Sequence, residues 1–67
     1  MIIDAREMIS GNKTYYIFYG EEYTVVKVKF PGSPLDVGIY SPNEGWNCAR
    51  PHILRPDVRD AVEALYC

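Results

Sequence analysis

Few side chains in this sequence could do chemistry, and the best-spaced pair is Cys48 with His52. Residues four apart share a face of a helix, so a thiolate and an imidazole could bind a metal there, with Cys67 as a third ligand. Pro51 lies between the two and disfavours a regular helix, and zinc sites are normally marked by two paired clusters. We therefore expect no metal and no cofactor, with Cys48 as a small buried side chain and His52 as a loop residue.

Nucleophilic catalysis has equally little support. An activated nucleophile needs a base and an orienting group, and His52 is the sole histidine. Cys48 and His52 could be drawn as a triad with Asp36 or Asp57, but no spacing singles this set out. The sequence holds no GxSxG, P-loop, GxGxxG or HExxH pattern. A chain of 67 residues also has little volume for a catalytic pocket, so we expect no enzymatic activity.

Length and charge limit the remaining classes. The 67 residues fit one domain, residues 1–67, and the 48% hydrophobic and 24% charged fractions are typical of a globular fold. A net charge of −2 has the wrong sign for duplex binding through a bulk field. No apolar run is long enough to span a bilayer, and Met1-Ile2-Ile3-Asp4 lacks the basic start of a signal peptide. We expect a cytoplasmic protein with reduced thiols and no membrane partner.

The clearest element is a β-hairpin made by residues 14–19 and 22–30. Aromatic and β-branched residues flank Gly20-Glu21, which suits a two-residue type II′ turn that pairs Tyr19 with Glu22. Alternation then divides the side chains between two faces. One face carries Tyr15, Ile17, Tyr19, Thr24, Val26 and Val28, and the other carries Tyr16, Phe18, Tyr23, Val25 and Lys27. Because both faces are largely apolar, the sheet needs two covering layers.

The sequence supplies one covering helix, at its C-terminal end. Pro56 suits the first helical position, and Asp57 lies where the helix dipole favours an anion. We expect about 11 helical residues with one apolar stripe, formed by Val58, Ala61, Val62 and Leu65. The solvated side of this helix is expected to carry Arg59, Asp60 and Glu63. Such a helix covers one face of the sheet and leaves the other bare.

The other segments complete a small α+β fold. Residues 2–9 read as a third strand or, through the Asp4-x-x-Glu7 capping pattern, as a short helix; we favour the strand because an isolated hairpin is marginally stable. Residues 35–40 form a short strand, in which Gly38 indicates a bulge or a close backbone approach. Residues 46–55 read as an ordered loop. The sequence thus predicts a three- or four-stranded, mainly antiparallel meander with one C-terminal helix packed on it.

The bare face is the candidate functional surface. It would present Tyr16, Phe18, Tyr23 and Val25, with Lys27 and Lys29 along one strand. Trp46 could add an anchor at the edge of the fold, although a single tryptophan in a small domain is more often a core residue. Exposed aromatic patches are typical of protein interfaces. We therefore expect a small binding module or regulator, of the size of many inhibitor-like proteins, that docks a protein partner or a second copy of itself as a homodimer. An exposed edge strand could serve the same purpose.

Two alternatives compete for this face. The middle segment, residues 42–55, could fold back and close it with Trp46, Ile53 and Leu54, because small domains need a large core. Aromatic side chains beside lysines could also stack single-stranded nucleic acid. The glycine- and arginine-bearing pattern of an RNA-recognition motif is absent, so protein binding is the favoured function.

Overall fold

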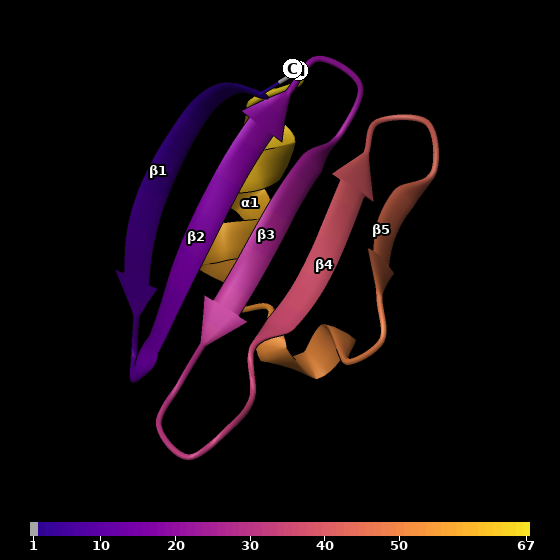
Figure 1. Ribbon diagram of the computed structural model, residues 1–67. Helices are drawn as coiled ribbons and strands as arrows, with labels where there is room; N and C mark the ends of the chain where they lie inside the picture. The colour runs from indigo at the N-terminus through magenta and orange to yellow at the C-terminus, as the bar shows by residue number, and fades with distance from the viewer. Residues whose placement is uncertain (1) are drawn as a thin grey trace.

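The computed structural model describes residues 2–67, which form one antiparallel sheet and two helical segments. The strands follow one another in chain order across the sheet, which makes it a meander (Figure 1). They are β1 (Ile2–Ser10), β2 (Lys13–Gly20), β3 (Thr24–Lys29), β4 (Asp36–Ser41) and β5 (Gly45–Cys48). A 3-10 helix, η1 (Pro51–Ile53), and the helix α1 (Pro56–Ala64) follow. The predicted α+β meander is confirmed, but it has five strands in place of three or four.

Residues 2–10 form a strand, β1, and the short helix suggested by Asp4-x-x-Glu7 is wrong. β1 pairs with β2 through a tight turn at Gly11-Asn12, where Gly11 has φ +65 and so takes the left-handed conformation that favours glycine. The Asp4 carboxylate accepts a hydrogen bond from the Ala5 N–H at 2.9 Å and caps no helix. Tertiary pairing along a whole strand outweighs the weak local helix signal.

The β2–β3 hairpin keeps the predicted faces but changes the predicted register. Tyr19 lies opposite Thr24, which shifts the pairing by two residues relative to the predicted Tyr19–Glu22 pair. The connection is longer than two residues, with the Gly20 N–H donating to the Tyr23 carbonyl at 3.1 Å. Gly20 lacks the positive φ that a type II′ turn requires there. A shift of two residues preserves which face each side chain occupies.

The segment predicted as a loop, residues 46–55, contains β5 and η1. β5 extends the sheet by pairing Trp46 with Tyr40 and Cys48 with Gly38. At Gly38 the neighbour is a side chain and not the predicted backbone, because a Cβ at that position would lie 3.4 Å from both Cβ and Sγ of Cys48. The missing side chain of Gly38 therefore lets Cys48 pack beside the sheet backbone.

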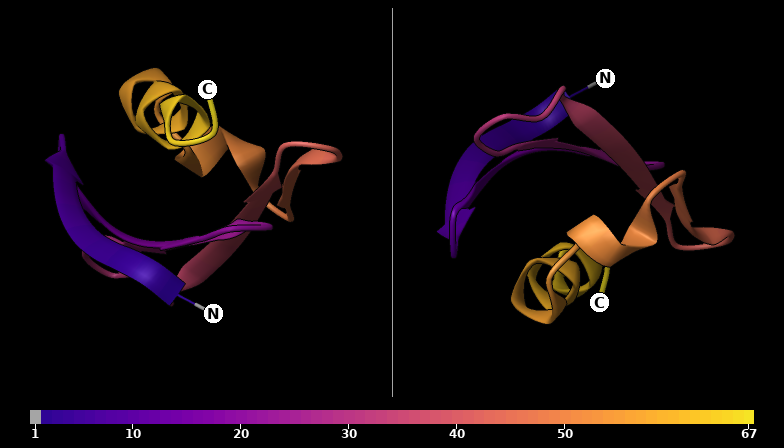
Figure 2. Two further views of the ribbon diagram at one scale, coloured as in Figure 1. Left: turned by 90° about the horizontal axis from the view of Figure 1, so that it is seen from above. Right: turned by 90° about the horizontal axis from the view of Figure 1, so that it is seen from below.

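Both helical segments lie on the same side of the curved sheet (Figure 2). The sheet side chains beneath them form what we call the inner face, and with the helices they make a single core. Its buried members are Tyr15, Ile17, Val26, Val28, Ile53, Leu54, Val58 and Val62. The predicted helix is confirmed, with Pro56 at its first turn, although it has 9 residues where about 11 were predicted.

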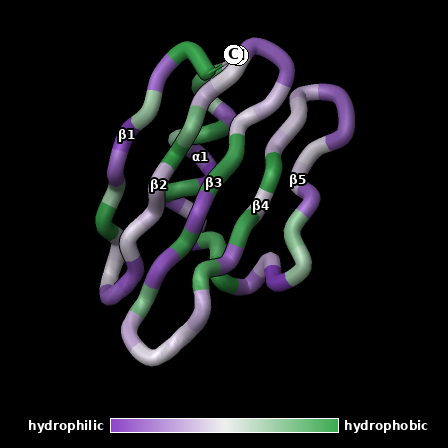
Figure 3. The backbone as a smooth tube through the Cα atoms, in the orientation of Figure 1, coloured by the Kyte–Doolittle hydropathy of each residue, from purple (hydrophilic) through white to green (hydrophobic). Residues whose placement is uncertain are grey.

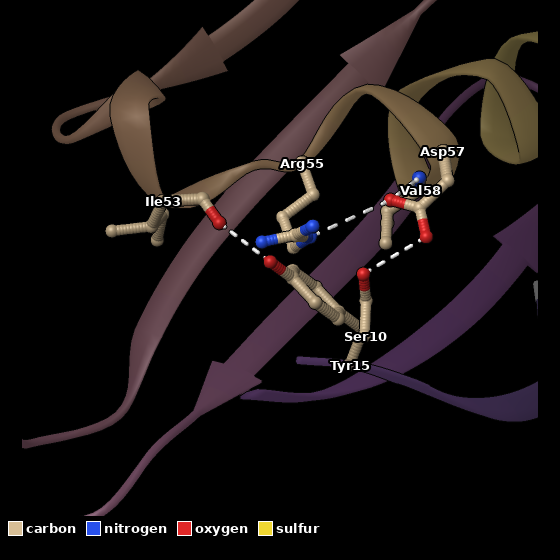
Figure 4. A network of polar contacts seen from close by, with 6 residues as sticks. All are labelled: Ser10, Tyr15, Ile53, Arg55, Asp57 and Val58. Carbon is tan, nitrogen blue, oxygen red and sulfur yellow. Dashed lines mark hydrogen bonds and ion pairs between the residues drawn. The ribbon is translucent and has the colours of Figure 1, made fainter. Parts of the chain in front are cut away.

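Polar contacts attach the helix start to the β1–β2 hairpin (Figure 4). The buried Ser10 hydroxyl donates to Oδ2 of Asp57 at 2.8 Å, and Nε of Arg55 lies 4.0 Å from Oδ1 of the same carboxylate. The hydrogen bond from Ser10 is the main cause that lowers the pKa of Asp57 below its ordinary value of 3.8. A lowered pKa stabilises the fold above the ordinary value, and this stabilisation is lost as the pH falls through the folded-state pKa.

We expect Ser10→Ala to lower the Tm at about pH 7 and to show less loss of stability than the wild type on acidification to about pH 2. Thermal melts followed by circular dichroism at several pH values test this. Ser33→Ala, in the β3–β4 loop, is the matched serine control and should follow the wild-type profile. A constant Tm difference between wild type and Ser10→Ala at every pH would contradict the assignment to Asp57.

Candidate functional site

The side of the sheet away from α1, here called the outer face, is covered by no helix or strand of residues 2–67 (Figures 1 and 2). The strand pairings place its side chains in rows that run across the strands. One row, which we call the central row, contains no charge and consists of Ala5, Phe18, Val25, Ile39 and Asn47. The next row along the strands consists of Glu7, Tyr16, Lys27 and Val37. Together the rows give a surface with an apolar centre.

The structure brings most of the predicted surface residues together. Tyr16, Phe18 and Val25 lie half-buried on the outer face, where they are neighbours in the two rows. Lys27 continues the strand from Val25, and its ammonium lies 5.4 Å from the centroid of the Phe18 ring. Lys29 is the last residue of β3, and the half-exposed Tyr23 directly precedes its first residue, Thr24.

Trp46 does not belong to this surface. It pairs with Tyr40 across β4 and β5, so it lies on the inner face, where the two rings are 5.0 Å apart. The indole N–H donates to the Glu63 carboxylate at 2.9 Å. Glu63, predicted on the solvated side of the helix, is half-buried, and its bond with Trp46 joins β5 to α1.

The middle segment does not cover the outer face. Its two buried apolar residues, Ile53 and Leu54, pack in the core with the helix. The Tyr15 hydroxyl holds this segment there by donating to the Ile53 carbonyl at 2.6 Å. Residues 42–55, which could have closed the outer face, therefore pack on the inner face instead.

Sequence reasoning missed several apolar residues of the outer face. Val37 and Ile39 of β4 are 45% and 37% exposed, and Ile9 of β1 is 72% exposed. A register shift between Ile2 and Asp4 marks a bulge that brings Ile2 and Ile3 to the same side. The period-two alternation of residues 35–40 was the available signal for β4, whereas a bulge has no comparable sequence signature.

A shallow hollow of about 370 Å³ lies at one end of the outer face. Gly20 contributes no side chain to it, and Glu21 and Glu22 give part of its lining. The apolar lining is formed by Ile2, Ile3, Phe18, Tyr23 and Val25. The hollow is thus an apolar depression with two carboxylates beside it.

Charge is distributed unevenly along the strands of this face. Glu21 and Glu22 lie in the β2–β3 loop, which is hydrophilic in Figure 3, and Lys29 lies at the opposite end of β3. At about 3.3 Å per residue the two ends are about 20 Å apart. Neither Lys27 nor Lys29 has an ion-pair partner within residues 2–67. The outer face therefore has an acidic end, an apolar centre and a basic end.

The sheet edges are less suited to docking than the face. In an antiparallel ladder every second residue of an edge strand turns its N–H and C=O outward. On β1 the Ala5 N–H is already bonded to the Asp4 carboxylate, and the bulge at Ile3 interrupts the strand. Both features hinder pairing of another strand with β1. At the other edge, β5 has only 4 residues and offers few backbone groups for pairing. The geometry favours the face over an edge.

Other chemistries gain no support from the arrangement. Cys48 packs against Gly38 while His52 is exposed on η1, and no cluster of His, Cys, Asp or Glu within residues 2–67 could hold a metal ion. Cys67 is exposed at the far end of α1. Within the same residues, the structure has no helix with the length and apolar character needed to cross a membrane. Comparison of this chain with protein-family models, curated proteins and solved structures found no match, so its function must be inferred from its own geometry.

Proposed function

We propose that this protein is a small non-enzymatic binding module that docks a protein through the outer face of its sheet. The observation that carries the proposal is the uncovered apolar centre of that face. Phe18, Val25 and Ile39 lie side by side in the central row, while every buried core residue lies on the inner side. Contiguous apolar patches larger than a few hundred Å² are rare on monomeric proteins and are typical of interaction sites.

Single-stranded nucleic acid is the competing ligand for the same face, and the structure offers it less support. The ammonium of Lys27 already lies over the Phe18 ring, which is the surface on which a base would stack. Glu7 lies in the same row as Lys27, and Glu21 lies at the end of the face. These carboxylates repel phosphates. We therefore propose a protein as the ligand.

A pull-down from a lysate of the native cells, with the purified chain as bait, tests this function. Phe18→Asp should reduce the retained protein at least about tenfold, because a carboxylate in the apolar centre would be desolvated without a partner. Ile39→Asp is a second variant on the same row and should act in the same way. Ala64→Asp, on the exposed side of α1, is the matched control and should retain the wild-type amount.

Circular dichroism of each variant separates lost binding from lost folding. Full retention by folded Phe18→Asp and Ile39→Asp would contradict the proposal. A parallel gel-shift assay with a mixed-sequence oligonucleotide at low salt tests the competing ligand, because phosphate contacts by Lys27 and Lys29 would weaken steeply as salt is added. Salt-sensitive oligonucleotide binding that requires both lysines would show that the outer face binds nucleic acid and not protein.

A further inference from the structure

We propose that the occupant of the outer face is a second copy of this chain, packed face to face about a twofold axis that lies along the central row. This inference rests on the proposed function and names the partner. In such a dimer the strands of the two copies run in opposite directions. The acidic end of each face then lies over the basic end of the other.

The first support is the composition of the central row. Residues on a twofold axis meet their own copies, so a charged row on the axis would place like charges together. The central row carries no charge, and Phe18, Val25 and Ile39 can pack against themselves. The neighbouring row could not take this place, because Lys27 would face Lys27 of the other copy.

The second support is the match in shape on either side of the axis. Tyr16 and Gly20 are each two residues from Phe18 along β2, on opposite sides of the row. Rotation about the axis therefore places Tyr16 of one copy over Gly20 of the other. The hollow of about 370 Å³ lies at this glycine, and it can receive an aromatic ring. Each copy thus offers one projecting ring and one cavity for it.

The third support is the match in charge. Tyr23, just before β3, and Lys27 are each two residues from Val25, on opposite sides of the central row. Glu21 lies in the β2–β3 loop beside the hollow, and Lys29 ends β3 on the other side of the row. The twofold rotation brings Lys29 of one copy toward Glu21 of the other, and Lys27 toward the Tyr23 ring. A face with charges of both signs at opposite ends is complementary to its own rotated copy.

Sheet curvature sets the size of the contact. The sheet bends across its strands, with the helix on the concave side, so the outer face is convex (Figure 2). Two convex faces touch along β2 and β3, which carry Tyr16, Phe18 and Val25, with Ile39 on the adjacent strand β4. We expect such a contact to bury less than the roughly 1,600 Å² of a standard interface, and therefore a reversible dimer.

Sedimentation equilibrium of the purified chain tests the proposal. We expect the mass to rise from 7.7 kDa toward about twice that value as the chain concentration approaches about 1 mM. Two charge variants then test the orientation: one carries Lys27→Glu with Lys29→Glu, and the other carries Glu21→Lys with Glu22→Lys. Each should raise its own dimer dissociation constant at least about tenfold, because like charges then meet at both ends.

Mixing the two variants is the decisive measurement. One variant carries glutamates at positions 21, 22, 27 and 29 and the other carries lysines at all four, so an equimolar mixture should form a heterodimer, whereas neither variant should form a stable dimer alone. Tyr16→Ala should weaken the wild-type dimer without changing the circular-dichroism spectrum. Dimers that persist in the separate charge variants, or a mixture that stays monomeric, would overturn the proposed packing.

A wild-type chain that stays monomeric throughout the concentration range would also overturn the homodimer. The proposed function is judged separately, by the pull-down with Phe18→Asp. If the chain is monomeric and Phe18→Asp reduces the retained protein, the outer face binds a different protein and not a second copy. If dimerisation responds to the charge variants as expected, the homodimer is supported whether or not the pull-down retains another protein.

Discussion

Ile17→Asp is expected to leave the chain unfolded, whereas Ile39→Asp is expected to fold. The two isoleucines occupy central strands on opposite faces, with Ile17 1% exposed on the inner face and Ile39 37% exposed on the outer face. Truncating a buried isoleucine to alanine already costs about 2–5 kcal/mol, and an unpaired carboxylate in the core adds to that. A core of this size supplies about 3–5 kcal/mol of net stability, so Ile17→Asp exceeds it.

Ile39→Asp removes the packing of a partly exposed side chain and lowers the strand propensity. We expect it to lower the free energy of unfolding by about 1 kcal/mol. That corresponds to a Tm lower by about 4–8 °C for a domain of this length. Urea denaturation and thermal melts of both variants measure the difference. Equal destabilisation by the two substitutions would mean that the outer face is as buried as the inner one, and it would remove the basis of both proposals.

Tyr15→Phe is expected to destabilise the fold by about 1–3 kcal/mol, because it leaves a buried carbonyl without its donor. The Tyr15 hydroxyl is fully buried and bonds the Ile53 carbonyl at 2.6 Å, which ties β2 to η1. Tyr16→Phe, one residue along on the outer face, is the matched control and should change stability by less than about 0.5 kcal/mol. Chemical denaturation at neutral pH compares the two variants.

The same substitution has a signature at alkaline pH. Burial raises the pKa of Tyr15 above its ordinary value of 10.0, although the backbone and the charge of Arg55 partly oppose the rise. A raised pKa means that the stabilisation is complete below the ordinary value and is lost as the pH rises through the folded-state pKa. Wild type should therefore lose more stability than Tyr15→Phe above about pH 10. Parallel curves for the two proteins would show that Tyr15 does not titrate in this way.

Much of the outer surface could be predicted because strand side chains alternate. Residues 14–19 and 24–29 carry apolar side chains at both parities, and one helix can cover one parity only. The predicted register of β2 and β3 was wrong by two residues, yet each side chain lies on its predicted face. Only a shift by an odd number of residues exchanges the faces. The placement of Tyr16, Phe18 and Val25 therefore did not depend on the length of the turn at Gly20.

The sequence left Trp46 open between an interface anchor and a core residue, because its environment depends on residues far along the chain. Its position follows from pairing with Tyr40 in β4 and from the hydrogen bond to Glu63 in α1, which is 17 residues away. β5 has 4 residues and shows no periodic pattern that would identify a strand. A strand this short exists because β4 offers it an edge, and that edge is a tertiary feature.

The sequence by itself predicted the two hairpin strands, at residues 14–19 and 22–30, the faces of their side chains and the helix that begins at Pro56. These follow from local periodicity and from the fixed geometry of proline, which need no partner. The tertiary structure alone decided that Ile53 and Leu54 join the core beside α1, and that Gly20 lies in a hollow at the acidic end of the outer face. Such features depend on which surfaces meet when the chain folds, and residues distant in sequence compete for the same apolar contacts.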